Sequence, residues 1–167
     1  MNDFFSLKGK VAVITGGSGF LGRQYGLALN GHGAEVVNWD LDTGVDITSE
    51  ESVRQAKETV VQQWGGINIL INNAAFNPQV GGSSTDDNWA PYERFSLELW
   101  RRELEVNLTA QMIVTQAIAP IMKEQRSGSI IFIASDLALI APQNSIYDPG
   151  RFKDIAYVSS KAGILGL

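Results

Sequence analysis

The sequence predicts an α/β fold, a Rossmann-type doubly wound parallel sheet, and three observations support this prediction. Short apolar runs alternate with longer segments of helical periodicity, which is typical of βαβ units. The run at residues 11–15 is short and apolar and leads directly into glycines, as expected for a strand that is covered on both faces. The chain has 167 residues, 44% of them hydrophobic and 19% charged, which suits one globular domain with a buried core. We therefore expect a single Rossmann domain over residues 1–167.

The elements follow from apolar periodicity and from the residues that end each run. Gly31 and Gly33 end the first predicted helix, and Ser96 is a suitable N-cap for the third. Strands are expected at residues 11–15, 34–39, 68–72 and 129–134, and helices at residues 20–30, 49–63, 96–125 and from 155 onward. Two polar stretches, 76–95 and 136–154, are expected to be irregular, and loops of this length are usually functional.

Composition excludes several function classes. A net charge of −5 without any run of Lys and Arg argues against nucleic acid or an anionic membrane as a partner. The chain has no cysteine, which excludes disulfides and thiolate metal sites, and we expect no metal. Residues 1–8 contain an acid where a secretion signal needs basic residues, and no stretch is long enough to span a membrane. We therefore expect a cytoplasmic protein.

A glycine-rich turn follows the first predicted strand. Gly17, Gly19 and Gly22 match the pattern G-x-G-x-x-G. Glycine lets a pyrophosphate approach the main chain at a helix N-terminus, where free N–H groups favour negative charge. A glycine cluster by itself is also compatible with a simple tight turn. The strand-to-helix position of this cluster favours a dinucleotide site.

An acidic residue follows the turn at the distance that a dinucleotide site requires. Asp40 lies eighteen residues after Gly22, at the end of the second predicted strand. A carboxylate at this place accepts hydrogen bonds from the adenosine ribose hydroxyls. It would repel a 2′-phosphate, and neither the turn nor the residues directly after Asp40 supply a Lys or Arg. The sequence therefore predicts NAD as the cofactor, with Asp42 as a nearby competitor and a solvated carboxylate as the alternative.

Tyr157 and Lys161 are four residues apart in the last predicted helix, so both side chains emerge on one face. A neighbouring ammonium lowers a tyrosine pKa from its usual value near 10, which allows the phenol to act as general acid or base. The same spacing also fits two solvated residues. Tyr147 is a rival, but no lysine follows it by one turn. Ser135, directly after a buried strand, lies where α/β proteins bind ligands.

Together these motifs resemble the short-chain dehydrogenase/reductase family, chiefly its classical branch. In family order they are the turn at 15–22, Asp40, residues 46–48, the Asn-Asn-Ala-Ala segment at 72–75, Asn107, Ser135, Tyr157 and Lys161. The resemblance implies that Tyr157 transfers a proton, Ser135 binds the substrate oxygen, Lys161 binds the nicotinamide ribose and Asn107 holds a relay water. The NAD contacts that it implies are Gly16, Ser18, Gly19, Phe20, Leu21, Gly22, Asp40, Asp46, Ile47, Asn73, Ala74, Tyr157 and Lys161.

The sequence departs from the family pattern at four places. The spacing Thr-Gly-x-x-Gly-x-x-Gly at 15–22 is similar to the extended branch, the sugar-nucleotide epimerases and dehydratases. Only five residues separate Asp40 from Asp46, so the third strand of the expected order 3-2-1-4-5 must be short or missing. The twenty-one residues between Ser135 and Tyr157 are suited to a polar flap, with Gln143, Asn144, Tyr147, Arg151 and Lys153. The chain ends at Leu167, inside a helix, so we expect the C-terminal part of the family domain to be absent.

The resemblance implies NAD(H)-dependent interconversion of an alcohol and a ketone. The Asn-Ala-Ala run before Asn77 and Pro78 is similar to relatives in flagellin-glycan and polysaccharide pathways, which suggests a sugar-like polar substrate. Full-length relatives pair through helices near Asn107 and Tyr157, so a homodimer or homotetramer is expected if the full domain is present. Two alternatives stay open: a non-catalytic NAD-binding or interaction module, and an epimerase or dehydratase that recycles NAD internally.

Overall fold

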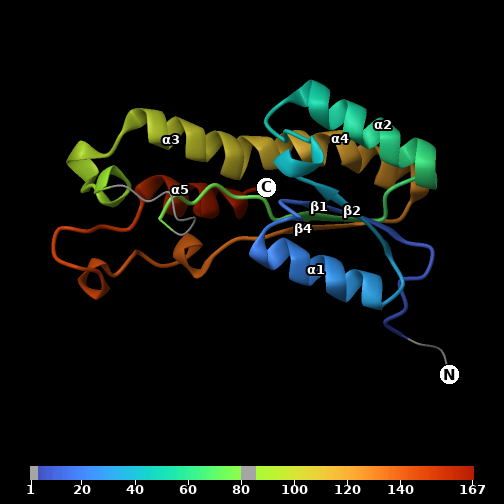
Figure 1. The fold of residues 1–167 in the computed structure, drawn as a ribbon, viewed down its shortest axis with the longest axis horizontal. Helices are drawn as coiled ribbons and strands as arrows, with labels where there is room; N and C mark the ends of the chain where they lie inside the picture. The colour runs from blue at the N-terminus through green and yellow to red at the C-terminus, as the bar shows by residue number, and fades with distance from the viewer. Residues whose placement is uncertain (1–3, 80–85) are drawn as a thin grey trace. The chain divides into compact units, whose positions relative to one another are not determined.

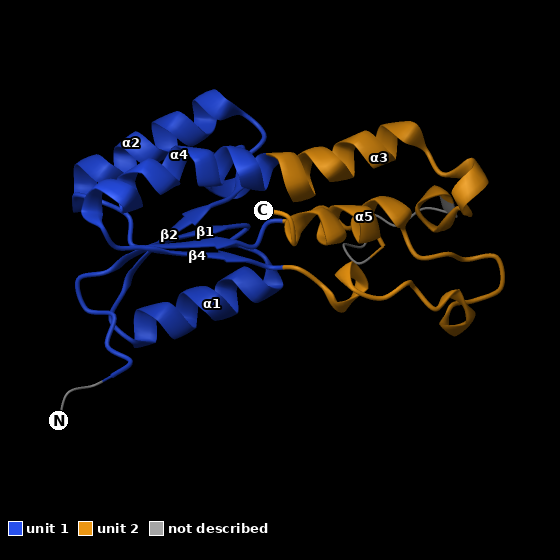
Figure 2. Ribbon diagram, turned by 180° about the vertical axis from the view of Figure 1, so that it is seen from behind, with its two compact units in different colours: residues 1–74, 110–133 blue, residues 75–109, 134–167 orange. Residues whose placement is uncertain are grey.

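The computed structural model describes residues 4–79 and 86–167 (Figure 1). Residues 80–85, which belong to the predicted irregular stretch 76–95, lie outside the described part of the chain. The chain forms two compact units (Figure 2). Unit 1 contains residues 1–74 and 110–133, and unit 2 contains residues 75–109 and 134–167. That the chain forms one domain remains a prediction.

Unit 1 is built on a parallel sheet. Its strands are β1 (Val11–Thr15), β2 (Glu35–Trp39), β3 (Ile69–Asn72) and β4 (Ser129–Phe132), in the order β2-β1-β3-β4. The register pairs Thr15 with both Trp39 and Asn72, and Asn72 with Phe132. The carboxyl ends of the four strands therefore lie at one edge, which is the edge at which α/β sheets bind ligands. The predicted Rossmann-type fold is confirmed.

The strand expected to be short or missing between Asp40 and Asp46 is not found in the described residues. A single 3₁₀ turn, Leu41–Thr43, takes its place. Gly44 ends this turn in the left-handed conformation, with φ of 81°, which glycine adopts without steric cost. The expected order 3-2-1-4-5 is thus reduced to four strands, and β3 occupies the position expected for the fourth.

Helices cover both faces of the sheet in unit 1 (Figure 1). The helix α1 (Phe20–Gly31) lies on one face, and α2 (Glu50–Trp64) and α4 (Ala110–Gln125) lie on the other. The core contains the completely buried side chains of Val13, Val53, Leu70, Val114 and Ile118. This apolar burial fixes the sheet and so positions the turns at its carboxyl edge.

Unit 2 is less regular. Its two α-helices, α3 (Leu97–Leu104) and α5 (Ile155–Ile164), lie side by side (Figure 2). Ser96 caps α3 as predicted, because its hydroxyl accepts a hydrogen bond from the Leu99 N–H at 3.3 Å. The helix predicted to run from Ser96 to Gln125 is interrupted, however, by a π-helical turn at Glu105–Thr109. None of the helices in the described ranges is both long and apolar enough to cross a bilayer.

Candidate functional site

The glycine turn of unit 1 is too tight for side chains at two positions. Gly16 has φ of 64°, and a Cβ there would lie 2.8 Å from the Ala74 Cα. A Cβ on Gly22 would collide with the carbonyl oxygen of Gly16. Glycine is therefore required at both positions for the turn to close, so that the main chain is exposed where α1 begins.

The N-terminus of α1 is open to an anion. Gly19 is its N-cap, no side chain caps the helix, and its first turn contains no acidic residue. The N–H groups of Phe20, Leu21 and Gly22 therefore have no intrahelical partner. Partial positive charge collects at such an end and favours a phosphate.

Asp40 faces this turn from the end of β2. Its Oδ2 accepts a hydrogen bond from the Ser18 N–H at 3.1 Å, and its Oδ1 accepts one from the Leu41 N–H at 2.7 Å. A carboxylate has about four acceptor positions, so Asp40 retains acceptor capacity for ribose hydroxyls. The competitor Asp42 also reaches the turn, because the Ser18 hydroxyl donates to its Oδ1 at 2.7 Å. Two acids thus contact Ser18.

Asn73 joins the ends of two strands. Its side-chain amide donates to the carbonyl oxygens of Thr15 and Gly16, both at 3.0 Å. The buried Thr15 hydroxyl accepts hydrogen bonds from the N–H groups of Asn73 and Ala74, at 3.0 and 3.1 Å. This network fixes the backbone at 73–74 beside the glycine turn, so the predicted residues Gly16, Asn73 and Ala74 are brought together.

The two predicted adenine contacts, Asp46 and Ile47, differ in the surroundings of their side chains. Asp46 directs its carboxylate to Thr48, whose N–H and hydroxyl donate to Asp46 Oδ1 at 2.9 and 2.7 Å. The Ile47 side chain is buried in the core of unit 1. A contact of Ile47 with adenine would therefore have to come from its main chain, and the roles of both residues stay predictions.

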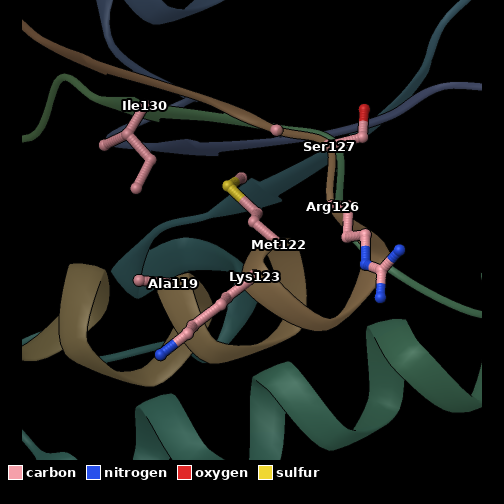
Figure 3. Close-up of a pocket in the computed structure, with 7 residues that line it drawn as sticks. Ala119, Met122, Lys123, Arg126, Ser127 and Ile130 are labelled. Carbon is pink, nitrogen blue, oxygen red and sulfur yellow. The ribbon is translucent and has the colours of Figure 1, made fainter.

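Unit 1 also has an open hollow that contains none of the predicted site residues (Figure 3). It is lined by Ala119, Met122, Lys123, Arg126, Ser127, Gly128 and Ile130. These residues belong to the end of α4 and the start of β4, so the hollow lies at the amino edge of the sheet. Ligands of α/β sheets bind at the opposite edge, and we assign no function to this hollow.

Unit 2 brings together three of the four predicted catalytic side chains. Tyr157 and Lys161 lie on α5, and the Lys161 Nζ is 5.8 Å from the centroid of the Tyr157 ring. The Ser135 side chain lies close enough to the Tyr157 phenol to favour its ionisation, and the Ser135 hydroxyl donates a hydrogen bond to Asp136 Oδ1 at 2.9 Å. Asp154 starts α5, because its Oδ1 accepts hydrogen bonds from the N–H groups of Ala156 and Tyr157 at 2.8 and 3.1 Å. This cap fixes the orientation of the turn that carries the phenol.

The pKa values at this site correct one expectation. Lys161 was expected to lower the Tyr157 pKa, but the pKa of Tyr157 lies above its usual value. Burial is the main cause, and the nearby charge of Asp136 adds to it, whereas the Ser135 side chain acts in the opposite direction. Burial also lowers the pKa of Lys161 to about 8, which weakens it as a source of positive charge at higher pH.

Known proteins are similar to this chain over most of its length. The sequence profile described as short chain dehydrogenase matches residues 10–167. The chain belongs to the short chain dehydrogenase family. Its match includes the glycine turn, Asp40, Asn107, Ser135, Tyr157 and Lys161, so it covers both units.

Three relatives illustrate the similarity. The chain is 30% identical to a 3-oxoacyl-(acyl-carrier-protein) reductase of Thermotoga maritima, over 96% of this chain and 66% of the relative. It is 30% identical to the D-threitol dehydrogenase of Mycolicibacterium smegmatis, over 99% and 64%. The structure of an NAD⁺-bound xylitol dehydrogenase superposes with a TM-score of 0.79 at 26% identity, over 95% and 62%. The chain thus spans just under two thirds of the length of these relatives.

Asn107, the fourth predicted catalytic residue, lies in the π-helical turn and is completely buried. Its Oδ1 accepts a hydrogen bond from the Phe76 N–H at 2.6 Å, and its Nδ2 donates to the Phe76 carbonyl at 2.9 Å and to the Ser160 hydroxyl at 3.3 Å. The Ser160 hydroxyl in turn donates to the Tyr157 carbonyl at 2.7 Å. Asn107 therefore supports the turn that carries the phenol, and its role in holding a relay water stays a prediction.

Sequence reasoning missed a group of buried charges in unit 2. Glu103 and Asp154 are completely buried, and Lys153 is 8% exposed. Lys153 was assigned only to the polar flap, although it precedes Tyr157 by the same four residues by which Lys161 follows it. Asp154 directly before an apolar helical segment is a recognisable N-cap signal. No sequence signal points to Glu103, because a glutamate in an amphipathic helix is usually exposed.

Proposed function

We propose that this protein is an NAD(H)-dependent oxidoreductase that interconverts an alcohol and a ketone. One observation carries the proposal: the Tyr157 phenol lies beside the Ser135 side chain and has the Lys161 ammonium near its ring. A phenol in this setting can give a proton to a carbonyl oxygen or take one from an alcohol. The family membership supports the same chemistry.

The residues of unit 1 fit a nicotinamide dinucleotide. The glycine turn would collide with side chains at Gly16 and Gly22, and the uncapped N-terminus of α1 suits the pyrophosphate. Asp40 would accept hydrogen bonds from the adenosine ribose, which favours NAD over NADP. When bound, the nicotinamide supplies or accepts the hydride.

In the reduction direction, Tyr157 Oη donates the proton that the reduced substrate oxygen needs. Ser135 Oγ donates a hydrogen bond to the same oxygen and holds it beside the phenol. Lys161 provides positive charge that stabilises the phenolate left after transfer, and Asn107 and Ser160 hold the main chain at Tyr157. In the oxidation direction the same phenolate accepts the alcohol proton, as microscopic reversibility requires.

The substrate is proposed to be a polar, sugar-like alcohol or ketone. D-threitol dehydrogenase and xylitol dehydrogenase, two of the similar proteins, are named for polyols. The polar residues of the stretch before α5, including Gln143 and Asn144, would suit hydroxyl groups of the substrate.

We also propose that the protein forms a homodimer or homotetramer, which light scattering of the purified protein would test.

Replacing the phenol tests the catalytic role. Tyr157→Phe should lower kcat by about 10²- to 10⁴-fold, the usual contribution of one general acid–base group, while the Kd for NADH changes by less than about threefold. Tyr147→Phe is the matched control, because Tyr147 packs edge-on against Trp89 at 5.4 Å and should retain full turnover. Equal loss of NADH binding and turnover in Tyr157→Phe would contradict the assignment.

NADH binding without any turnover in the parent protein would favour a non-catalytic module, and turnover without net change of NADH absorbance would favour internal recycling.

The proposed role of Asp40 in selecting NAD over NADP can be tested by measuring cofactor preference. Asp40→Asn should lower the ratio of kcat/KM for NAD over that for NADP by about tenfold or more, because a carboxylate that binds ribose and repels a phosphate is removed. Asp42→Asn is the matched control and shows whether the second acid on Ser18 contributes. A larger effect of Asp42→Asn than of Asp40→Asn would transfer the selectivity role to Asp42.

A further inference from the structure

A second lysine lies nearer to the Tyr157 phenol ring than the family lysine does. The Lys153 Nζ is 4.6 Å from the ring centroid, compared with 5.8 Å for the Lys161 Nζ. Only 8% of Lys153 is exposed, so solvent screens its charge weakly. Lys153 comes from the segment just before α5, whereas Lys161 comes from within the helix. The ring of Tyr157 thus has two ammonium groups within cation–π range.

Gln79 holds the Lys153 ammonium in place. The Gln79 Nε2 donates hydrogen bonds to the carbonyl oxygens of Asn88 and Phe152, at 2.8 and 3.0 Å. These two acceptors fix the orientation of the amide, because the flipped amide would point its oxygen at two other oxygens. The Gln79 Oε1 must therefore face Lys153, and it accepts a hydrogen bond from the Nζ at 2.8 Å. The Lys153 ammonium is therefore held in place by the neutral amide of Gln79. This hydrogen bond does not neutralise its positive charge.

The backbone of Lys153 is anchored as well. Its N–H donates to Asn144 Oδ1 at 3.0 Å, and Asp154, the next residue, caps α5. Both ends of the Lys153 side chain are therefore fixed relative to the turn that carries the phenol. A lysine used only to fill space would not need such support, since a buried apolar side chain of similar length packs at lower cost.

The charges that face these groups come from several elements. Around Lys153, burial disfavours the ammonium, whereas Asp154 and Glu103 of α3 favour it. Around Tyr157, Asp136 disfavours the phenolate and the Ser135 side chain favours it. Burial thus lowers the pKa of Lys153, and the charge of Asp154 opposes this shift. Glu103 opposes it only where it is ionised, because its own pKa is raised to about 9.

We propose that Lys153, positioned by Gln79, is a second cationic partner of the Tyr157 phenol that stabilises the phenolate. Lys153 and Gln79 are positioning residues, since they act through Tyr157. The effect on the ionisation of Tyr157 does not depend on turnover. Its consequence, which is that proton transfer extends to lower pH, rests on the proposed function.

The ionisation can be measured without substrate. The chain has four tyrosines, so ¹⁹F NMR of the protein labelled with 3-fluorotyrosine resolves them, and the Tyr157→Phe variant identifies the Tyr157 signal. Fluorination also lowers phenol pKa values, which keeps the titration in a pH range where the protein is folded. Lys153→Met should raise the titration midpoint of Tyr157 by about one pKa unit or more, as expected on removing an opposite charge within about 4–6 Å.

Three variants serve as controls. Lys153→Arg keeps the charge and should leave the midpoint within about half a pKa unit of the parent. Gln79→Leu keeps the lysine but releases it, so the midpoint should rise by less than in Lys153→Met. Lys123→Met removes an exposed lysine of unit 1 and should leave the midpoint unchanged. If Lys153→Met does not fold, as judged by circular dichroism, the Arg and Gln79 variants still decide the question.

An unchanged Tyr157 midpoint in Lys153→Met, or equal shifts in Lys153→Met and Lys153→Arg, would overturn the proposal. In active protein, the pH profile of kcat for alcohol oxidation should move to higher pH in Lys153→Met by the same amount as the NMR midpoint. A rise of KM alone, with an unchanged midpoint, would make Lys153 a substrate contact and also overturn it. A shifted midpoint in a parent protein without turnover would support the charge effect while refuting the proposed function.

Discussion

The two units bury opposite kinds of side chain. Apart from prolines, all buried apolar side chains of the described residues except Ala156 and Ile164 belong to unit 1. The buried charged side chains of the described residues all belong to unit 2, namely Glu103, Lys153, Asp154 and Lys161. Unit 1 is therefore stabilised mainly by apolar burial, which does not depend on pH. The stability of unit 2 depends on the protonation states and charges of its buried ionisable groups.

Because of this difference, unit 1 is suited to be a scaffold and unit 2 to carry ionisable groups. The sheet of unit 1 needs close packing and main-chain geometry to present the glycine turn, so its function rests on the absence of side chains at Gly16 and Gly22. Unit 2 needs buried ionisable groups with perturbed pKa values, which are expensive in stability and typical of functional sites. A substitution should therefore act through sterics in unit 1 and through proton binding in unit 2.

The largest effect is expected in the glycine turn of unit 1. In Gly22→Ala the new methyl group would overlap the carbonyl oxygen of Gly16 and would lie 2.7 Å from the Gly17 Cα. Because main-chain atoms cannot move aside easily, we expect a loss of about 3 kcal/mol or more in the free energy of unfolding. NADH binding should weaken with it, because the turn that exposes the main chain can no longer close. Urea denaturation and fluorescence titration with NADH measure the two effects.

Gly31→Ala is the matched control in the same helix. A Cβ at Gly31 would meet no atom within 4 Å, so this variant should be neutral or more stable by up to about 1 kcal/mol. Similar stability of the two variants would show that the turn relaxes, and the steric account of unit 1 would then be wrong.

Apolar periodicity predicted the elements of unit 1 well, because each buried strand or helix there is an uninterrupted apolar pattern. The strand at β1 was predicted with its observed bounds, and α1, α2, β2, β3 and β4 differ by one or two residues at an end. Tyr157 and Ser135 could be proposed as site residues because their positions in or next to regular elements can be recognised from the sequence. Both residues belong to unit 2, where the Ser135 side chain lies beside the Tyr157 phenol.

The rest could not be predicted from local patterns. The π-helical turn at Glu105–Thr109 contains Asn107, whose hydrogen bonds join it to Phe76 and Ser160, which are distant in sequence. The burial of Glu103 depends on α3 packing against α5, and the contact of Lys153 with Tyr157 depends on Gln79. Periodicity reports which side of a helix is apolar, but it does not report which charges will be paired across two segments.

The next largest effect concerns the buried acids of unit 2. Burial, together with the hydrogen bond and charge of Asp154, raises the pKa of Glu103 from 4.5 to about 9. The folded protein therefore holds a proton that the unfolded chain releases above about pH 4.5, and stability should fall as pH rises from about 4.5 toward about 9. A proton shared with Asp154 also supplies a hydrogen-bond donor to this buried pair, in which Asp154 Oδ2 and both Glu103 carboxylate oxygens otherwise have none.

Glu103→Gln should remove much of this pH dependence, because glutamine resembles the protonated acid and cannot ionise. We expect the parent to lose up to about 4 kcal/mol between pH 5 and pH 8, and the variant to lose markedly less over the same range. Glu105→Gln, at an exposed position, should keep the slope of the parent. Equal slopes for the parent and Glu103→Gln, measured by urea denaturation at each pH, would mean that Glu103 is ionised in the folded protein.

The smallest effect is the most direct comparison of the two units, because it makes the same change in each. Ser49 caps α2 in unit 1 by accepting a hydrogen bond from Ser52 N–H at 3.3 Å, and Ser96 caps α3 in unit 2 by accepting one from Leu99 N–H at 3.3 Å. Ser49→Ala and Ser96→Ala should each cost about 1 kcal/mol, and Asp at either position should restore most of it.

The caps also test the prediction of a single domain. If the chain unfolds as one cooperative domain, both alanine variants should lower the midpoint of one shared transition by similar amounts, and circular dichroism and tryptophan fluorescence should report the same curve. Trp39 and Trp64 lie in unit 1, and Trp89 and Trp100 lie in unit 2, so fluorescence follows both units. Two separate transitions, each shifted by only one of the variants, would show that the apolar scaffold and the charged unit fold independently.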